Sequence, residues 1–307
     1  PYTNMENYPS FASENHKKTA YMAAAESITL LKNKGALLPA NTSSKVMVIG
    51  PTANSLNCLN GAWTHTWQGI DPQYNNTENP TIFEAIKKGT KSSDLYRGSI
   101  MKMVEGDEAD FPSYDLTVAV KNAKNYDFAV VCLGELPSTE RPGDIYTLDM
   151  AKEQREIVKE LSKTGVKIVL VLIEGRPKII SDIEPLADAV IQCYLPGDQG
   201  GRVLSDIIFG KINPSGKLPY TYPRHNGVIM HYDHKQSELI NANTWKNDFF
   251  NPQYEFGFGL SYTNYEYSNL KISKNVFSPL DKTITVSVDV KNTGGKAGKE
   301  VVQLYSR

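Results

Sequence analysis

The 307-residue chain lacks the features that mark several large classes of protein. Its net charge is -1, with 33 basic and 34 acidic residues, so it has no cationic excess with which to neutralise the phosphates of a nucleic acid. No uninterrupted apolar run approaches the roughly 18 residues of a membrane span. We therefore expect neither a nucleic acid nor a membrane among its main partners.

Cysteine is also scarce. The three cysteines, Cys58, Cys132 and Cys193, cannot all pair with one another. Cys132 and Cys193 lie in apolar segments, where a free thiol behaves as a small hydrophobic side chain. No cysteine has the spacing of a metal site, and the short cluster His231-Tyr232-Asp233-His234 is typical of a solvated loop. We expect no metal and no other cofactor.

Short apolar runs alternate with segments of helical period along the first two thirds of the chain. After an extended polar lead-in, strands are predicted at 46–50, 127–133, 167–173 and 189–194, and helices at 19–31, 81–88, 115–124, 150–163, 177–184 and 200–209. Strands that are buried on both faces of a parallel sheet have near-continuous apolar sequences, as these have. The predicted fold is therefore α/β, with a mostly parallel sheet covered by helices in an α/β sandwich.

The last third of the chain has a different character. Residues 224–263 show no clear period and are predicted to form a connecting segment, and from about Asn264 the sequence becomes β-like. Residues 283–290 alternate strictly between polar and apolar, and a turn at 292–295 leads to a second predicted strand at 300–305. This pattern indicates the beginning of a β-sandwich.

The most informative stretch is the loop Gly134–Asp144, which directly follows the apolar strand at 127–133. In open α/β sheets, ligands bind where loops leave the carboxyl ends of strands. A carboxylate such as Glu140, held on a loop stiffened by proline and glycine, is a candidate general acid/base. Glu135 is the rival candidate, although a carboxylate at a strand end more often braces a loop. The residues alone also leave open that Glu140 is an ordinary solvated acid.

Seven short motifs together give a resemblance to glycoside hydrolase family 3, because they occur in that family's order over most of the chain. They lie at residues 24–33 (AAESITLLKN), 60–69 (NGAWTHTWQG), 134–144 (GELPSTERPGD), 171–177 (VLIEGRP), 196–201 (PGDQGG), 210–219 (GKINPSGKLP) and 256–263 (FGFGLSYT). The chain has no Walker or GxGxxG spacing in its 196–201 turn, so a nucleotide-binding domain is not favoured.

The resemblance implies a retaining, exo-acting β-glycosidase, in the first place a β-glucosidase that hydrolyses terminal β-linked glucose. A β-xylosidase is the alternative among enzymes, and a non-catalytic carbohydrate-binding module is the alternative outside them. Family members place a nucleophilic aspartate on an N-terminal barrel that this sequence does not contain, so this portion would be inactive without that barrel domain. The resemblance also implies a secreted or periplasmic protein that acts on β-linked oligosaccharides or glycosides.

The same resemblance assigns parts of the chain. Residues 1–20 would be a linker from the barrel, 21–223 the α/β sandwich domain, 224–263 the connecting segment, and 264–307 part of a fibronectin type III-like domain.

Individual roles also follow from the resemblance. Glu140 would protonate the departing oxygen and then act as the base that activates water. Trp67 and Trp63 would bind the apolar face of a sugar ring, the alternative being that both indoles only anchor their loop. Two positions depart from the family pattern, since Ser138 replaces a tyrosine and Ala62 replaces a glycine. Both departures put the leaving-group preference in doubt.

Overall fold

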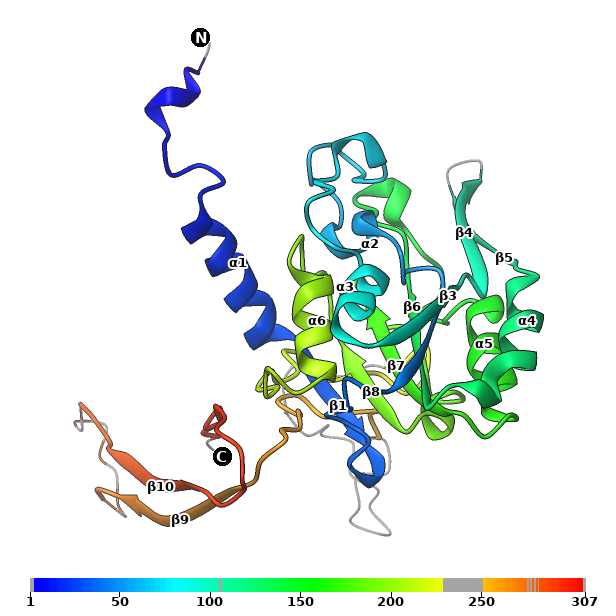
Figure 1. Ribbon diagram of the computed structural model, residues 1–307. Coiled ribbons are helices and arrows are strands. Elements are labelled where there is room, and N and C mark those ends of the chain that lie inside the picture. The colour runs from blue at the N-terminus through cyan, green and yellow to red at the C-terminus, as the bar shows by residue number, and fades with distance from the viewer. Residues whose placement is uncertain are drawn as a thin grey trace.

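A six-stranded sheet forms the centre of the protein (Figure 1). The computed structural model describes residues 3–104, 107–228, 251–274, 276, 278, 280 and 282–305. In spatial order the sheet contains β1 (Thr29–Asn33), β8 (Ala189–Gln192), β7 (Lys167–Ile173), β6 (Phe128–Gly134), β2 (Lys45–Ile49) and β3 (Ser92–Tyr96). Strand β1 is antiparallel to β8, and every other neighbouring pair is parallel. The prediction of a mostly parallel sheet is confirmed.

Helices cover both faces of this sheet (Figure 1). The helices are α1 (Glu14–Ser27), α2 (Leu56–Asn60), α3 (Ile82–Gly89), α4 (Asp115–Asn122), α5 (Lys152–Ser162) and α6 (Gly200–Ile208). One buried cluster joins the sheet to α2, α3 and α6, and a second joins its other face to α4 and α5. Alternate side chains of β6 enter the two clusters, with Val130 in the first and Val131 in the second. Burial on both faces explains why this strand has a continuous apolar sequence.

Short 3-10 turns connect several of these elements. They are η1 (Met5–Asn7), η2 (Lys34–Ala36), η3 (Pro72–Tyr74), η4 (Ala123–Asn125), η5 (Arg141–Gly143) and η6 (Glu184–Leu186).

The prediction for the N-terminal part was wrong in two respects. Residues 1–20 are not extended throughout, because α1 begins at Glu14, where the Ser13 hydroxyl accepts a hydrogen bond from the backbone N–H of His16. The predicted helix at 19–31 ends early, because residues 29–33 form β1 and pair with β8. Burial against the sheet edge outweighs the helical pattern there.

Two further predicted elements are absent from the described chain. Residues 177–184 do not form a helix, because Lys178 donates its backbone N–H to the Glu174 carboxylate and Ile179 donates its own to Leu148. Residues 300–305 form no strand. The His231–His234 cluster lies outside the described residues.

Three hairpin or edge elements were not predicted in full. Strand β3 and the hairpin of β4 (Ser99–Val104) and β5 (Asp107–Pro112) have sequences without strict alternation, and β3 and β5 are mostly polar. This hairpin projects from the main body near β3 (Figure 1). Strands β9 (Tyr265–Ile272) and β10 (Val286–Asn292) form an antiparallel hairpin, as the β-like character from Asn264 predicted.

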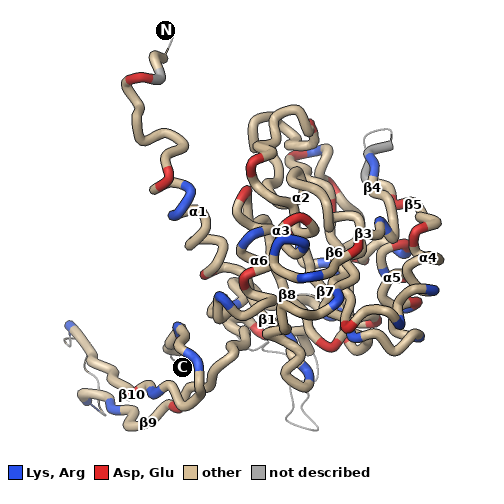
Figure 2. The backbone as a smooth tube through the Cα atoms, viewed as in Figure 1, with Lys and Arg blue, Asp and Glu red and all other residues tan. Residues whose placement is uncertain are grey.

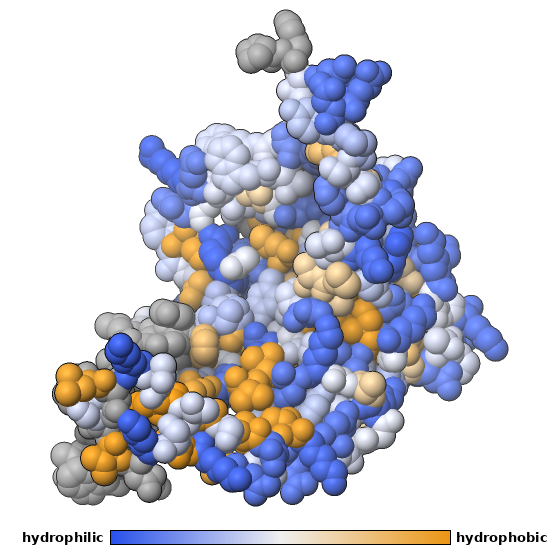
Figure 3. Space-filling view, turned by 90° about the vertical axis from the view of Figure 1, so that its left-hand side faces the viewer, coloured by the Kyte–Doolittle hydropathy of each residue, from blue (hydrophilic) through white to orange (hydrophobic). Residues whose placement is uncertain are grey.

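The surface agrees with the even composition. Basic and acidic residues are interspersed along the drawn chain, without a basic stripe over the described residues (Figure 2). Apolar side chains gather on the side of the β9–β10 hairpin, where Leu270, Ile272 and Ile284 are exposed (Figure 3). Within the described part of the chain, none of the helices has the length and apolar character needed to cross a bilayer.

Candidate active site

A pocket of about 290 Å³ lies where the loops leave the carboxyl ends of β6, β7 and β8. Residues 135–140 and Gly143 of the loop after β6 form most of its wall. Gly175 and Arg176 come from the loop after β7, Leu195 follows β8, and Ala62 belongs to the tryptophan-containing loop at 61–69. The pocket therefore occupies the sheet edge at which the sequence predicts a ligand site.

Glu140 is the exposed acid of this pocket. Its backbone has φ +53° and ψ −150°, a combination that is costly for a residue with a side chain. The backbone carbonyl of Glu140 accepts a hydrogen bond of 2.8 Å from the N–H of Gly143, which closes the turn η5. Its carboxylate has no hydrogen-bond partner among the described residues and faces solvent. Such a backbone persists only where surrounding contacts hold it.

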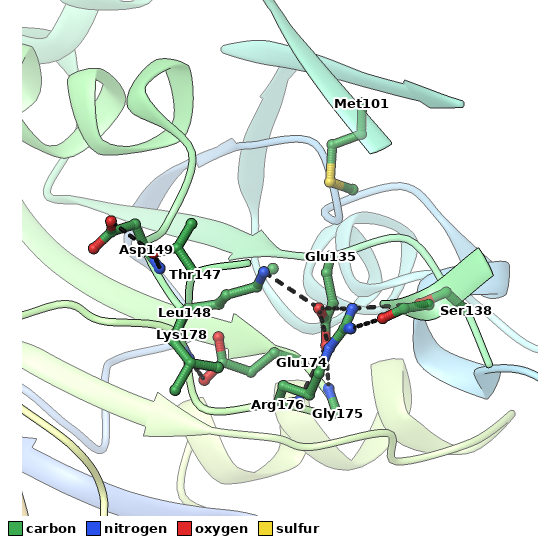
Figure 4. Close-up of polar contacts among 12 residues, drawn as sticks. Met101, Glu135, Ser138, Thr147, Leu148, Asp149, Glu174, Gly175, Arg176 and Lys178 are labelled. Atoms are coloured by element: carbon green, nitrogen blue, oxygen red, sulfur yellow. Dashed lines mark hydrogen bonds and ion pairs between the residues drawn. The ribbon is translucent and has the colours of Figure 1, made fainter. Parts of the chain in front are cut away.

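Arg176 supplies part of that support (Figure 4). Its guanidinium donates to the Ser138 hydroxyl at 3.3 Å and to the backbone carbonyl of Gly143. These two contacts lie on either side of Glu140 in the sequence. The first turn after β7 therefore holds both flanks of the loop that carries the exposed acid.

Glu135 is fully occupied as the counter-ion of this arginine (Figure 4). Its Oε2 accepts from Arg176 Nε at 3.0 Å and from Nη2 at 2.6 Å, and Lys178 Nζ lies 3.5 Å away. Its Oε1 accepts from the backbone N–H groups of Gly175 and Arg176, both at 3.0 Å. The buried Glu135 carboxylate thus braces the loops, which is the structural alternative that the sequence raised for this residue.

The loop at 61–69 presents the two tryptophans. Trp63 is 65% exposed and Trp67 is 48% exposed, and neither lines the pocket itself. The backbone N–H of Trp63 donates to the carbonyl of Trp67 at 3.0 Å, so the loop closes on itself. Gly69 has φ +70°, and a Cβ there would lie 2.2 Å from the Gly61 carbonyl oxygen, so this closure requires glycine. Both indoles are thus partly exposed to solvent.

Gln68 joins the tryptophan loop to the Glu140 loop. Its Oε1 accepts from the backbone N–H of Thr139 at 3.0 Å, and its Nε2 donates to the Thr139 carbonyl at 3.1 Å. Sequence reasoning missed the roles of both Gln68 and Arg176. The only signal was their position within two of the family motifs, next to residues that did attract attention.

A third carboxyl group, Glu174, was also missed. Its Oε1 accepts from Tyr222 Oη at 2.9 Å and from Lys178 N at 3.3 Å, whereas Oε2 has no partner among the described residues. Burial raises the pKa of this carboxyl to about 8, and the negative charge of Glu135 adds to the rise, although the Tyr222 and Lys178 contacts oppose it. Glu174 lies beneath the pocket and does not line it. Within the described chain, no group of three potential ligands could hold a metal ion.

Comparison with known proteins adds the family context. The model of the glycosyl hydrolase family 3 C-terminal domain matches residues 28–262. A β-glucosidase structure from Erythrobacter marinus superimposes with a TM-score of 0.75 at 28% identity, covering 93% of this chain and 40% of that one.

Three curated relatives align with nearly the whole chain. A lysosomal β-glucosidase from Dictyostelium discoideum is 37% identical, over 94% of this chain and 36% of its own length. A periplasmic β-glucosidase from Salmonella typhimurium is 32% identical, over 94% of this chain and 40% of its own. A β-xylosidase from Formosa agariphila is also 32% identical, over 96% of this chain and 40% of its own. The chain thus spans well under half the length of the curated relatives it matches.

Proposed function

Because the chain belongs to glycoside hydrolase family 3, we propose that it is the acid/base-bearing portion of a retaining, exo-acting β-glycosidase. Its substrate would be a glycoside or oligosaccharide with a terminal β-linked glucose. The observation that carries this proposal is the different state of the two carboxylates in the pocket. Glu135 is buried and paired, whereas Glu140 is exposed and held on a braced, strained turn.

Glu140 would act in both steps of the reaction. Retaining hydrolysis needs two carboxyl groups about 5–5.5 Å apart, one to attack the anomeric carbon and one to protonate the departing oxygen. Glu140 would give its proton to that oxygen and then remove a proton from the attacking water. The nucleophile would come from a barrel domain outside this sequence.

The tryptophan loop would contribute to sugar binding. Pyranose rings present apolar C–H faces, and an indole offers a large flat surface with a polar N–H group. The exposed faces of Trp67 and Trp63 suit this role. Ser138, in place of the family's tyrosine, leaves less bulk on the leaving-group side of Glu140, and its hydroxyl is already engaged by Arg176.

The wider organisation is part of the same proposal. Residues 1–20 would link to the barrel, 21–223 would form the α/β sandwich domain, and 224–263 would connect it to a fibronectin type III-like domain that begins at 264. The exposed apolar residues of the β9–β10 hairpin suit one layer of such a sandwich. A secreted or periplasmic location is proposed by analogy with the periplasmic relative.

A β-xylosidase is the second candidate, favoured by the relative of that name. The residues that choose between glucose and xylose would lie mainly on the barrel, so the described pocket does not separate them. A non-catalytic carbohydrate-binding module is the remaining alternative.

The deciding experiment substitutes Glu140→Ala in a polypeptide that contains both this chain and the barrel. Two aryl β-glucosides are compared, one with a poor and one with an activated leaving group. We expect the variant to lose about 10²–10⁴-fold in kcat on the poor leaving group, to form the glycosyl-enzyme with the activated one, and to regain turnover with azide. Glu78→Ala, which removes an exposed acid elsewhere, is the matched control.

Unchanged turnover of both glucosides by Glu140→Ala would refute the assignment of the acid/base. Activity of the wild type on aryl β-xylosides alone would select the β-xylosidase. Failure of the wild type on every glycoside, with sugar binding retained, would favour the binding module.

A further inference from the structure

Gln68 connects the two loops that would hold the sugar and the acid. Its side-chain amide forms two antiparallel hydrogen bonds with the backbone of Thr139, of 3.0 and 3.1 Å. The geometry copies the pairing of two strand residues, with one amide group from a side chain and the other from the main chain. Two simultaneous bonds fix the orientation of Thr139 as well as its distance from Gln68. We refer to this pair of hydrogen bonds as the clamp.

The two partners of this clamp are next to the two functional residues. Trp67 immediately precedes Gln68 in the sequence, and Glu140 immediately follows Thr139. The two hydrogen bonds therefore tie together the backbone segments that carry the indole and the carboxyl group. Among the described side chains, only that of Gln68 bonds to the backbone of Thr139.

The clamp is anchored at its tryptophan end. Asn57 on α2 donates from Nδ2 to the Gly69 carbonyl at 2.7 Å, and the Gly69 N–H donates to the Thr66 hydroxyl at 3.2 Å. In the sequence, Gln68 lies directly between Trp67 and Gly69. The loop that presents the indole is thus hydrogen-bonded to the helix α2. Through Gln68, Thr139 is linked to this same helix.

The other end of the clamp needs support. Arg176 forms hydrogen bonds with Ser138 and Gly143 but, among the described residues, none with Thr139 or Glu140. Glu140 has a positive φ, and a residue in that region returns to a common conformation unless its neighbours prevent it. Gln68 is the contact that holds the residue just before this strained position.

We propose that Gln68 is a positioning residue for proton transfer, which fixes the carboxyl group of Glu140 relative to the sugar bound on Trp67. The inference rests on the proposed role of Glu140. A displacement of about 1 Å at a reacting group can cost about 10²-fold in rate. Releasing Thr139 would weaken proton donation in the first step, which matters for a poor leaving group and little for an activated one, and it would weaken water activation in the second step for both.

The test replaces Gln68→Met, which keeps the length of the side chain and removes both hydrogen bonds. Gln68→Glu is a second variant, because its carboxylate keeps the acceptor for the Thr139 N–H but lacks the donor. Gln73→Ala is the control, since Gln73 is exposed and, within the described part of the chain, its side chain hydrogen-bonds only to Asp71 on its own turn. All are made in a polypeptide that contains the barrel, and kcat, KM and the thermal midpoint are measured.

We expect Gln68→Met to lower kcat/KM, which reports the first step, by about 10–100-fold on the poor leaving group and by less than about threefold on the activated one. Its kcat on the activated glucoside should fall as well, because Glu140 also activates water in the second step. Gln68→Glu should lie between this variant and wild type, Gln73→Ala should match wild type, and the thermal midpoint should change little. Equal losses of kcat/KM on both glucosides, or none on either, would overturn the positioning role. The Glu140→Ala variant run in parallel separates the two proposals, because its own lack of leaving-group dependence would refute the acid/base assignment instead.

Discussion

The buried carboxyl of Glu174 makes the stability of this protein depend on pH. Its pKa is about 8 in the folded protein, chiefly because of burial, against 4.5 for an exposed carboxyl. The folded state therefore keeps a proton that the unfolded chain releases, and the resulting stability is fully present below pH 4.5. This stability is lost progressively as the pH rises from 4.5 through 8, because the carboxyl group is ionised in the unfolded chain and still protonated in the folded protein over this range.

The magnitude follows from the two pKa values. At about 1.36 kcal/mol per unit, a folded pKa of about 8 against 4.5 corresponds to at most about 5 kcal/mol. The substitution Glu174→Gln removes the ionisation and preserves the hydrogen bonds of the protonated acid. Its Oε1 can still accept from Tyr222 Oη and from Gln192 Nε2, as the Oε1 of Glu174 does at 2.9 and 3.4 Å.

Urea unfolding at pH 5, 6, 7 and 8 measures this effect. The free energy of unfolding of wild type minus that of Glu174→Gln should fall by about 2–5 kcal/mol over this range, because only the wild type must bury a charge. Glu78→Gln, which removes an exposed carboxyl, should give a difference that does not change with pH. Parallel pH profiles for wild type and Glu174→Gln would show that Glu174 is charged in the folded protein and would refute this reasoning.

Two further predictions concern the loops. Glu135→Gln leaves Arg176 without its buried counter-ion and should lower the free energy of unfolding by about 3 kcal/mol in urea titrations, a result that equal stability would contradict. Trp67→Ala should raise KM for an aryl β-glucoside about tenfold through loss of a stacking surface, with the control Tyr114→Ala, an exposed aromatic that does not line the pocket, near wild type; an unchanged KM for Trp67→Ala would assign its indole to another role.

The buried strands could be predicted because burial on both faces of the sheet requires a nearly continuous apolar sequence. Strand β7 has its predicted bounds, Lys167–Ile173, since an apolar run buried on both faces has one stable place in a parallel sheet. Strand β3 (Ser92–Tyr96) lies at the sheet edge, where one side is open and polar residues are tolerated. Residues 29–33 look helical in sequence because an alanine-rich segment precedes them, and their pairing with β8 depends on residues about 160 positions away.

In the candidate site, too, one part could be predicted from the sequence and another could not. Glu140 could be selected because its loop follows a predicted buried strand and because of the motif around it, and it does line the pocket at that sheet edge. The partners that hold it could not. Gln68 contacts Thr139 across 71 positions, and Arg176 contacts Ser138 across 38. A glutamine or an arginine in a polar loop has many alternative partners, so the fold alone decides which contact is made.

Three carboxyl groups at one sheet edge are thus given three different states by their surroundings. Arg176 and Lys178 together neutralise Glu135, and the charge of Glu135 in turn raises the pKa of Glu174. A second negative charge at Glu174 would compete for the same arginine and lysine and loosen the contacts of Arg176 with Ser138 and Gly143. Keeping Glu174 protonated therefore protects the bracing of the loop that carries the exposed Glu140.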